Sequence, residues 1–423
     1  MPNTKQYSGF DGLGIAPGLM AALDRLKFST PTPIQSKSIP PALEGKDMIG
    51  IAQTGTGKTL AFGIPMLQRL AQLKGRGLVI LPTRELALQV EESLHKIGGG
   101  IGLRTTVLIG GASMNMQLQG LRRNPHIIIA TPGRLIDHLN QRTVDLSGVK
   151  ILVLDEADRM LDMGFAPQIA KILATVPRER QTMLFSATMP DSIAQIAAKH
   201  MKLPVRIEVA RAGTAAERVE QEIFFVSKEE KPRLLDKLLA EYHGSILVFS
   251  RTKFGAKKIA RSVNAMGHRA AEIHSNRSLA QRREALDGFK SGKYRVLIAT
   301  DIAARGIDVT GIEVVINYDL PDNAEDYVHR IGRTGRAGHT GRAVSFAAPD
   351  ERNEVREIER LIRSNLPVTK LTELPPARQP AVVTSPAHGG RMKMQENRPR
   401  QQGNYFNKRG GRGFGGRNQF RRK

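Results

Sequence analysis

The chain contains no cysteine, which excludes disulfides, thiolate metal sites and thiol catalysis. No apolar run approaches the roughly 18 residues that a membrane-spanning helix needs, and the N-terminus lacks the basic-then-apolar order of a signal peptide. Acidic residues are scarce, since 40 Asp and Glu stand against 64 Lys and Arg, a formal net charge of +24. We therefore expect a cytoplasmic protein that binds a polyanion, with nucleic acid ahead of a membrane surface.

The basic charge is concentrated near the C-terminal end of the sequence. From Pro375 to Lys423 there are twelve Lys and Arg against one acid, Glu396, and aliphatic residues are few. This composition predicts a disordered basic tail over residues 368–423. Arginine interleaved with glycine and with Phe414 is typical of a sequence-tolerant RNA tether, and a solubilising tail without a partner is the alternative. The RNA-contact candidates in the tail are Arg409, Arg412 and Arg417.

Short apolar runs recur along the rest of the chain, with room for a helix between them. In the first half they are Asp47–Ala52, Gly77–Leu81, Thr106–Ile109, Ile127–Ala130, Ile151–Leu154 and Met183–Phe185. In the second half they are Glu222–Val226, Ser245–Phe249, Arg269–Ile273, Arg295–Ala299, Val314–Asn317 and Ala343–Phe346. Unbroken apolar strands that alternate with helices predict parallel β-sheets flanked by helices. The fold class is therefore α/β, with two tandem domains at 39–210 and 219–367 and a polar linker at 211–218.

A glycine-rich loop follows the first predicted strand and precedes a helix. Gly55 and Gly57 allow backbone N–H groups to turn toward phosphate oxygens, and the helix N-terminus adds its dipole. Lys58 can neutralise phosphate charge and Thr59 can bind Mg²⁺, although Ala52 stands where the general pattern has glycine. The nucleotide-binding candidates in this loop are Ala52, Gln53, Thr54, Gly55, Thr56, Gly57, Lys58 and Thr59.

Two acids follow the predicted strand Ile151–Leu154. Asp155 is placed to hold a metal ion and Glu156 to act as general base on the attacking water. An acidic pair after a strand is, by itself, more often a solvated helix N-cap. Together with the phosphate loop, however, the pair predicts hydrolysis of a bound nucleotide with Mg²⁺ as cofactor, and the resemblance given next implies that the nucleotide is ATP.

These residues, with the Asp-Glu-Ala-Asp tetrapeptide that begins at Asp155, resemble the DEAD-box family of RNA helicases. The resemblance covers about residues 8–365 and implies two RecA-like domains, each carrying part of the ATP site. It also implies an adenine-reading region over residues 8–36, where Gln35 would hydrogen-bond adenine and Phe10 would be the upstream aromatic residue. The tail on a compact core resembles the bacterial RhlE-type branch.

The resemblance implies RNA contacts in both halves. In the first half, Arg84 and Arg134 would offer charge to phosphates, while turn residues would offer hydroxyls and backbone amides. Ser186 and Thr188 belong to an element that resembles the family's coupling of hydrolysis to strand separation. The RNA contacts implied outside the tail are Arg84, Gly111, Thr131, Arg134, Arg251, Thr252, Arg282, Thr300 and Arg330.

An arginine-rich motif near residue 330 completes the implied ATP site. Arg333 and Arg336 would reach the γ-phosphate, and Asp308 would lie toward the ribose. Their spacing of three predicts Arg330, Arg333 and Arg336 on one helical face. Such an arginine is worth on the order of 10³ or more in rate, which would make hydrolysis depend on domain closure. The predicted catalytic residues are Lys58, Asp155, Glu156, Ser186, Thr188, His329, Arg333 and Arg336.

The predicted function is RNA-stimulated ATP hydrolysis coupled to local unwinding of short RNA duplexes or to RNP remodelling. RNA would be gripped through its backbone and 2′-hydroxyls, and ribosomal or RNA-decay complexes are the candidate protein partners. One alternative is a DNA-directed helicase or another two-domain ATPase, which ATPase stimulation by RNA against matched DNA would separate. Another is a non-enzymatic ATP-gated RNA clamp or annealing protein, which deletion of residues 375–423 would test.

Overall fold

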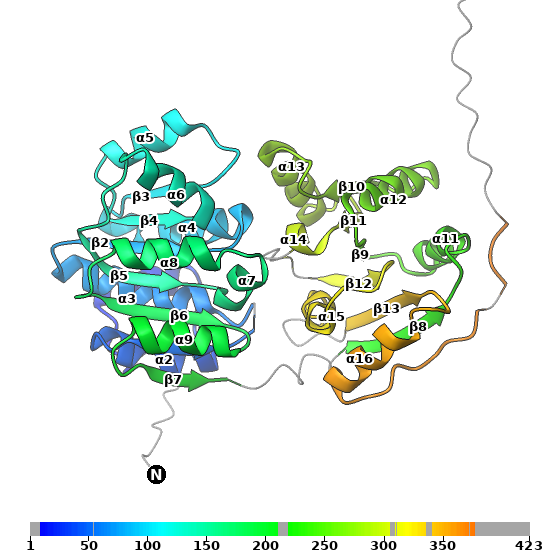
Figure 1. Ribbon diagram of the computed structural model, residues 1–423, viewed down its shortest axis with the longest axis horizontal. Coiled ribbons are helices and arrows are strands. Elements are labelled where there is room, and N and C mark those ends of the chain that lie inside the picture. Colours follow the sequence, from blue (N-terminus) through cyan, green and yellow to red (C-terminus); the bar gives the residue numbers. More distant parts are fainter. Residues whose placement is uncertain are drawn as a thin grey trace, which may run out of the picture. The chain divides into compact units, whose positions relative to one another are not determined.

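The computed structural model describes residues 9–53, 55–209, 219–304, 309, 311–335, 341–371 and 373–376. The strands in these ranges form two sheets, of seven and six strands, and all their neighbouring pairs are parallel. Helices cover both faces of each sheet, which confirms the predicted fold class (Figure 1). The predicted linker, most of the basic tail and the site candidates Thr54, Asp308, Arg336, Arg409, Arg412 and Arg417 lie outside the described residues.

The first sheet contains all six strands predicted for the first half and one more. In spatial order its strands are β3 (Thr105–Leu108), β4 (Ile127–Ala130), β2 (Arg76–Ile80), β5 (Val149–Leu154), β6 (Gln181–Ser186), β1 (Met48–Ile51) and β7 (Val205–Glu208). Successive strand residues point to opposite faces. Ile127 and Ile129 therefore belong to the hydrophobic cluster on one face, and Ile128 belongs to the cluster on the other. Because both faces of the sheet are buried, the strand sequences are unbroken apolar runs.

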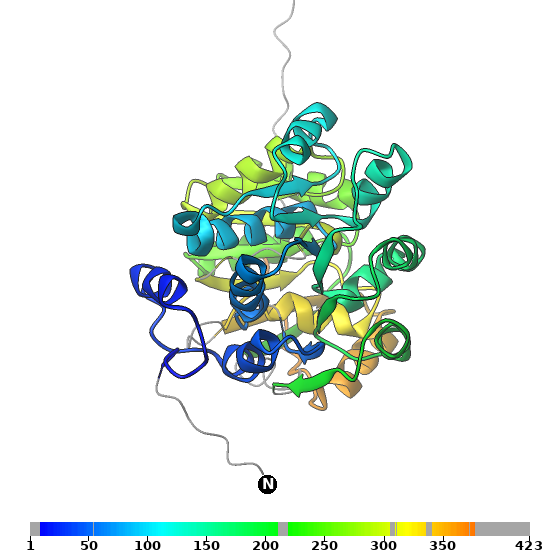
Figure 2. The ribbon, with the colours of Figure 1, turned by 90° about the vertical axis from the view of Figure 1, so that its left-hand side faces the viewer.

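Each face of the first sheet has its own set of helices. One face packs against α1 (Pro17–Arg25), α2 (Pro33–Leu43), α3 (Lys58–Gln72) and α4 (Arg84–Gly98), and the short 3₁₀ helix η1 (Gly99–Ile101) follows α4. The opposite face packs against α5 (Met114–Arg122), α6 (Pro132–Asn140), α7 (Ala157–Asp162), α8 (Ala166–Thr175) and α9 (Asp191–His200). In Figure 2 the blue α1 and α2 lie on one side of this sheet and the green α8 and α9 on the other.

The edge strand β7 was not predicted from the sequence, because exposed and buried residues alternate along it. In Val205–Glu208 only Ile207 is buried, so the segment lacks the continuous apolar run that marked the other strands. A buried carboxylate fixes this edge. Asp47 accepts hydrogen bonds from the backbone N–H of Thr182 (2.6 Å) and of Lys202 (2.7 Å), which joins the start of β1 to β6 and to the chain leading into β7.

The second sheet contains the six strands predicted for the second half. In spatial order they are β10 (Ala270–Ile273), β11 (Val296–Ala299), β9 (Ser245–Phe249), β12 (Ile312–Asn317), β13 (Gly341–Ala347) and β8 (Val219–Phe225). One face packs against α11 (Lys231–Glu241) and α12 (Lys253–Ala265). The other packs against α13 (Leu279–Lys290), α14 (Asp301–Ala304), α15 (Ala324–Ile331) and α16 (Arg352–Ile362). None of the described helices is both long and apolar enough to cross a bilayer.

The packed part of the second domain continues beyond residue 367, the boundary predicted from the sequence. Val368 forms a parallel bridge with Ile223 of the outer strand β8. The Arg233 guanidinium of α11 donates to the carbonyl of Leu374 (3.1 Å) and to that of Pro375 (2.7 Å). Leu374 also packs on the cluster beneath α11. The terminal segment, residues 366–371 and 373–376, therefore contacts the edge strand of the second sheet and the cluster beneath α11.

Candidate functional site

The phosphate loop occupies the carboxyl end of β1, where the loops of a parallel sheet gather. Gly55 and Gly57 have φ values of 85° and 92°, a region that side chains with a Cβ rarely enter. A Cβ at Gly57 would also collide with the side-chain amide of Gln35. Helix α3 begins at Lys58, directly after Gly57, so its free N–H groups face the loop.

Gln35 connects the phosphate loop to the start of α2. Its Oε1 accepts from the Thr32 N–H (2.8 Å), and its Nε2 donates to the Gly57 carbonyl (3.0 Å). Its side chain is buried, and so is that of Phe10, which belongs to the first domain's core. In this structure the two residues that the resemblance assigned to adenine thus have internal partners, and adenine recognition by them stays a prediction.

A buried lysine and a buried carboxylate face each other behind the loop. Lys58 Nζ lies 3.8 Å from Asp155 Oδ1, and this Nζ is buried without a hydrogen-bond partner among the described residues. Burial raises the pKa of Asp155 from its ordinary 3.8 to about 6, with Lys58 lowering it and Glu156 raising it. An ammonium that can still donate hydrogen bonds, behind a phosphate loop, suits an anionic ligand.

Replacing Asp155 with asparagine is expected to stabilise the protein at pH 7 in the absence of nucleotide and Mg²⁺. Because the folded-state pKa is raised to about 6 from 3.8, the folded protein retains a proton that the unfolded chain releases, and stability falls as pH rises through that window. Asparagine mimics the protonated acid, so this fall should flatten. Thermal melting at pH 5, 6 and 7 measures it, with the exposed Asp24→Asn as control, and an unchanged pH profile would contradict the assignment.

Glu156 adopts an unusual backbone conformation and has a buried partner. Its φ of 53° lies in the left-handed region, which non-glycine residues occupy mainly where surrounding structure enforces it. Arg159 Nη1 donates to Glu156 Oε2 at 2.6 Å, and both side chains are buried. Arg159 was not predicted from the sequence, because a basic residue in the first turns of a helix usually indicates a solvated face. The proposed base is thus held by a neighbouring cation.

The last acid of the tetrapeptide lies in α7 and connects this helix to the end of β6 and the loop that follows it. Asp158 Oδ2 accepts from the Ala187 N–H (3.0 Å), the Thr188 N–H (2.8 Å) and the Thr188 Oγ1 (3.0 Å). The Asp158 N–H in turn donates to Ser186 Oγ at 3.2 Å. Ser186 and Thr188 are therefore joined to the acidic strand end through Asp158.

The RNA-contact candidates of the first domain lie after β2, β3 and β4, at the start of α4, in the loop after β3 and at the start of α6. The Arg84 guanidinium lies against Gly111, whose φ is 77°, so that a Cβ at Gly111 would collide with it. Arg134 Nη1 donates to the Ala112 carbonyl at 3.3 Å. Thr131, the N-cap of α6, places its Oγ1 3.5 Å from the Leu108 carbonyl. The structure thus brings all four candidates, Arg84, Gly111, Thr131 and Arg134, to one edge of the sheet.

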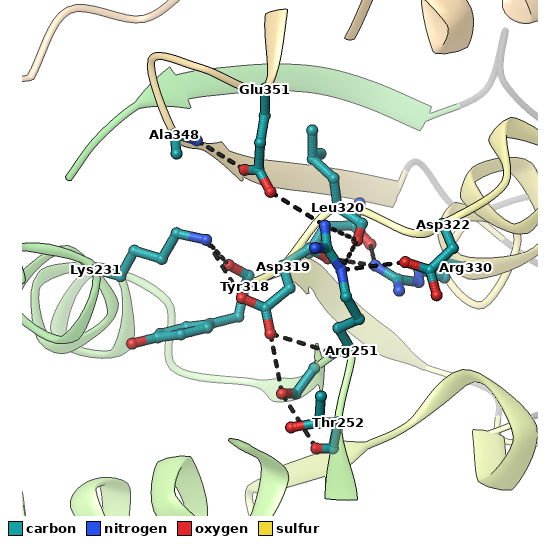
Figure 3. A network of polar contacts seen from close by, with 12 residues as sticks. Lys231, Arg251, Thr252, Tyr318, Asp319, Leu320, Asp322, Arg330, Ala348 and Glu351 are labelled. Carbon is teal, nitrogen blue, oxygen red and sulfur yellow. Dashed lines mark hydrogen bonds and ion pairs between the residues drawn. The ribbon is translucent and has the colours of Figure 1, made fainter. Parts of the chain in front are cut away.

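In the second domain, a polar network surrounds the end of β12 (Figure 3). Asp319 Oδ2 accepts from Ser250 Oγ (3.0 Å) and from the Arg251 N–H (3.1 Å). Lys231 Nζ lies 3.3 Å from Asp319 Oδ1. The Arg251 guanidinium pairs with Glu351 at 3.1 Å and remains partly exposed. Asp319 therefore fixes the loop after β9, in which Arg251 is a predicted RNA contact.

Arg330 is buried in this network. Its Nε and Nη2 donate to the two carboxylate oxygens of Asp301 at 2.6 and 2.7 Å. Its Nη1 donates to the Asp319 carbonyl at 2.6 Å and to Asn317 Oδ1 at 3.2 Å. With 1% of its surface exposed, Arg330 has no access to an RNA phosphate in this structure. Its observed role is to fix α14, which follows Thr300, against α15.

The prediction that the arginines share one helical face is wrong for Arg330 and Arg333. Helix α15 ends at Ile331, and Gly332 is its C-cap, so Arg333 lies in the following turn. Arg333 Nε donates to the His329 carbonyl at 3.2 Å, and His329 Nδ1 lies 3.7 Å from Asp326 Oδ1. Glycine weakens helix interiors, so Gly332 and Gly335, the latter with a φ of 66°, favour ending the helix before Arg333.

Two further RNA-contact candidates, Arg282 and Thr252, make side-chain hydrogen bonds within the protein. Arg282 Nη2 donates to Glu85 Oε2 at 2.8 Å, an ion pair that joins α13 to α4. Burial lowers the pKa of Arg282, while Glu85 acts in the opposite direction. Thr252 caps α12 by accepting from the Gly255 N–H at 2.9 Å, and its side chain is exposed at the domain surface.

The two parallel sheets, with a phosphate loop and an acidic strand end on the first, define a nucleotide-hydrolysing enzyme built from two similar domains. The sequence model of the DEAD/DEAH box helicase family matches residues 32–196, and that of the helicase conserved C-terminal domain matches residues 230–338. The chain therefore belongs to the DEAD-box family of ATP-dependent RNA helicases, as the sequence predicted.

Individual relatives support this assignment. The ATP-dependent rRNA helicase RRP3 of Debaryomyces hansenii is 44% identical over 86% of this chain and 77% of that protein. The DEAD-box ATP-dependent RNA helicase CshA of Geobacillus kaustophilus is 44% identical over 84% of this chain and 77% of that protein. The solved structure of S. cerevisiae Dbp5 bound to RNA and ADP BeF3 is 31% identical, with a TM-score of 0.78, and covers 86% of this chain and 96% of that one.

Proposed function

We propose that the chain hydrolyses ATP at the carboxyl edge of the first sheet and couples each turnover to local separation of RNA strands or remodelling of RNPs. The observation that carries the proposal is the buried Lys58 Nζ, which lacks a hydrogen-bond partner among the described residues and lies behind the phosphate loop. Burying an ammonium group without hydrogen-bond acceptors costs free energy, unless a ligand supplies the acceptors. Phosphate oxygens held by the loop would do so.

Mg²⁺ fits the residues at this site. The groups at hand are the Asp155 carboxylate and the Thr59 hydroxyl, hard oxygen ligands of the kind that Mg²⁺ prefers. Within the described ranges no group of three or more His, Cys, Asp or Glu could hold a metal by itself. That agrees with an ion bound by one or two protein oxygens, water and substrate phosphates. When bound, it would neutralise charge on the phosphates.

Glu156 is the proposed general base. Its carboxylate would accept a proton from the water that attacks the γ-phosphate, while Lys58 stabilises the phosphate oxygens. Arg159 positions that carboxylate through the buried ion pair. Asp158, bound to the Ser186–Thr188 loop, would pass the change at the γ-phosphate to the surface that holds RNA. Arg333 and Arg336 are proposed to complete the site upon closure.

RNA is proposed to lie along the loops that carry Arg84, Gly111, Thr131 and Arg134 in the first domain and Thr252 and Thr300 in the second. These groups supply guanidinium, hydroxyl and backbone donors, which suit phosphates and ribose hydroxyls and read no base edges. Arg251 contributes through its partly exposed guanidinium. A cytoplasmic location, partners in ribosomal or RNA-decay complexes, and membership of the RhlE-type branch stay predictions.

Single-stranded RNA is expected to stimulate the ATPase well above a DNA of the same sequence, because the ribose 2′-hydroxyl can be contacted only in RNA. RNA affinity should also fall steeply with salt, since each phosphate neutralised contributes about −0.7 to the logarithmic salt slope for single strands. Steady-state ATPase measured with both polymers between 50 and about 200 mM salt tests both points. Equal stimulation by DNA would favour a DNA-directed or general ATPase instead.

A further inference from the structure

Helix α12 begins directly after the loop that carries Arg251 and Thr252, at the carboxyl end of β9. Its orientation is fixed by four buried residues that pack on the second sheet: Ala256, Ile259, Ala260 and Val263. The opposite face is therefore presented to solvent along the whole helix. It carries Phe254, Lys257, Lys258 and Arg261, all exposed. Their spacing of three and four places them in one continuous stripe, the α12 stripe.

The α12 stripe is unusually basic for an exposed helix face. Lys253–Ala265 contains four basic residues and no acid. Within the described part of the chain, Lys257, Lys258 and Arg261 form no ion pair, although Glu272 and Glu284 line the same surface pocket as Lys257 and Arg261. Helix α16 of the same domain provides a contrast, because its exposed arginines alternate with glutamates. A cluster of positive charges makes the local electrostatic potential more positive, which attracts an anionic partner.

Phe254 stands at the end of the stripe nearest the loop after β9. Its side chain is 70% exposed, and Lys253 Nζ lies 5.3 Å from the ring centroid. Lys253 is itself held by a 3.2 Å hydrogen bond to Asn276 Oδ1. A single exposed apolar residue needs no explanation by itself. An aromatic ring at the head of a row of cations, however, is the combination by which proteins bind single-stranded nucleic acid.

We infer that the α12 stripe binds single-stranded RNA, extending the RNA path beyond the strand segment held by the loops at the carboxyl ends of the strands. Phe254 stacks on a base, and Lys257, Lys258 and Arg261 contact the phosphates that follow. Phe254 and Arg261 are seven residues apart, roughly 10 Å along the helix axis, which a few nucleotides span. The inference rests on the proposed function, because it requires that RNA already occupies the loop that leads into α12.

The first experiment tests the charges in the full-length chain. Lys258→Glu/Arg261→Glu is compared with Arg356→Glu/Arg360→Glu, which reverses two exposed charges on α16 of the same domain. The half-saturating RNA concentration for ATPase stimulation is measured with a short RNA and with the same RNA extended at its 5′ or its 3′ end. In the wild type, extension at one end only should tighten binding. The α12 variant should lose that gain, and the α16 variant should keep it.

Salt dependence gives a second reading of the same variants. Loss of two phosphate contacts should reduce the logarithmic salt slope for the extended RNA by roughly 1.4 and leave the slope for the short RNA unchanged. For the ring, Phe254→Leu keeps apolar volume and removes stacking, so affinity for the extended RNA should fall about 5-fold or more, while Phe254→Trp restores it. Basal ATPase and melting temperature should not move in any of these variants.

The outcomes separate this inference from the proposed function. If wild-type ATPase responds to no RNA, the proposed function itself fails. If the wild type responds equally to short and extended RNA, or if the α12 and α16 variants behave alike, the RNA path ends at the loop after β9 and the α12 stripe is not part of it. If extended-RNA affinity is unchanged but the α12 variant alone loses binding to acidic polypeptides such as polyglutamate, the stripe is a protein-docking surface.

Discussion

Replacing Glu156 with glutamine is expected to reduce steady-state ATP hydrolysis by about 10²- to 10⁴-fold while nucleotide binding persists, because general bases typically contribute this much. The substitution removes the proton acceptor and retains the shape of the side chain. Lys58 and Asp155 are unchanged, so the phosphate and metal contacts proposed above should remain. RNA binding in the presence of ATP should also persist, since the enzyme is arrested before the step that would release it.

Hydrolysis and binding must be measured separately to test this. Phosphate release measures hydrolysis, and a fluorescent ATP analogue measures nucleotide binding. Asp162→Asn is the matched control, because Asp162 lies in the same helix, α7, and is exposed. Glutamine also leaves the buried Arg159 without an anionic partner, so a melting curve should accompany the assay. Near-normal turnover in a folded Glu156→Gln protein would contradict the assignment of the base.

Replacing Arg330 with methionine is expected to destabilise the second domain by about 3–5 kcal/mol, the usual cost of removing one partner from a buried ion pair. The guanidinium is 1% exposed and donates to both carboxylate oxygens of Asp301. Methionine fills a similar volume without charge. The uncompensated Asp301 carboxylate should therefore dominate the loss, and Asp301→Asn added to Arg330→Met should recover part of it.

Urea unfolding followed by far-UV circular dichroism measures the loss, with the exposed Arg363→Met as control. The same variants distinguish the two interpretations of Arg330. If the residue contacts RNA, as the resemblance implied, Arg330→Met should weaken RNA binding and leave stability intact. The buried ion pair predicts the opposite result, a large loss of stability. Any loss of RNA affinity would then be indirect, caused by movement of α14 and of Thr300, which precedes it.

The sequence predicted the sheets well because burial on both faces leaves a strong local signal. Every apolar run named at the outset became a strand. The missed strand, β7, has only Ile207 buried and lies at an edge, where pairing with β1 and the Asp47 carboxylate fix its position. Those are contacts between distant parts of the chain, and alternation over four residues could not reveal them.

The site was predicted less evenly, since its motifs fix which residues gather and not where each side chain points. Lys58 and Asp155 were found because phosphate chemistry requires them at a strand end. The roles of Arg159 and Arg330 were harder to predict, because a charged residue on a helix is normally solvated. Only the fold shows that both side chains are buried against carboxylates. Gln35 likewise has an internal partner, the Gly57 carbonyl, that no spacing rule indicates.

The terminal segment, residues 366–371 and 373–376, has a practical consequence for shortening the protein. A cut at 367 would remove Val368 and Leu374, uncovering the outer strand β8 at Ile223 and the apolar surface beneath α11. Unprotected strand edges promote association between copies of a protein. A cut after Pro376 would remove the basic extension and leave this cover in place. If the protein cut at 367 is less soluble than the protein cut after Pro376, the cause is damage to the second domain. Such a loss says nothing about the RNA affinity of the deleted arginines.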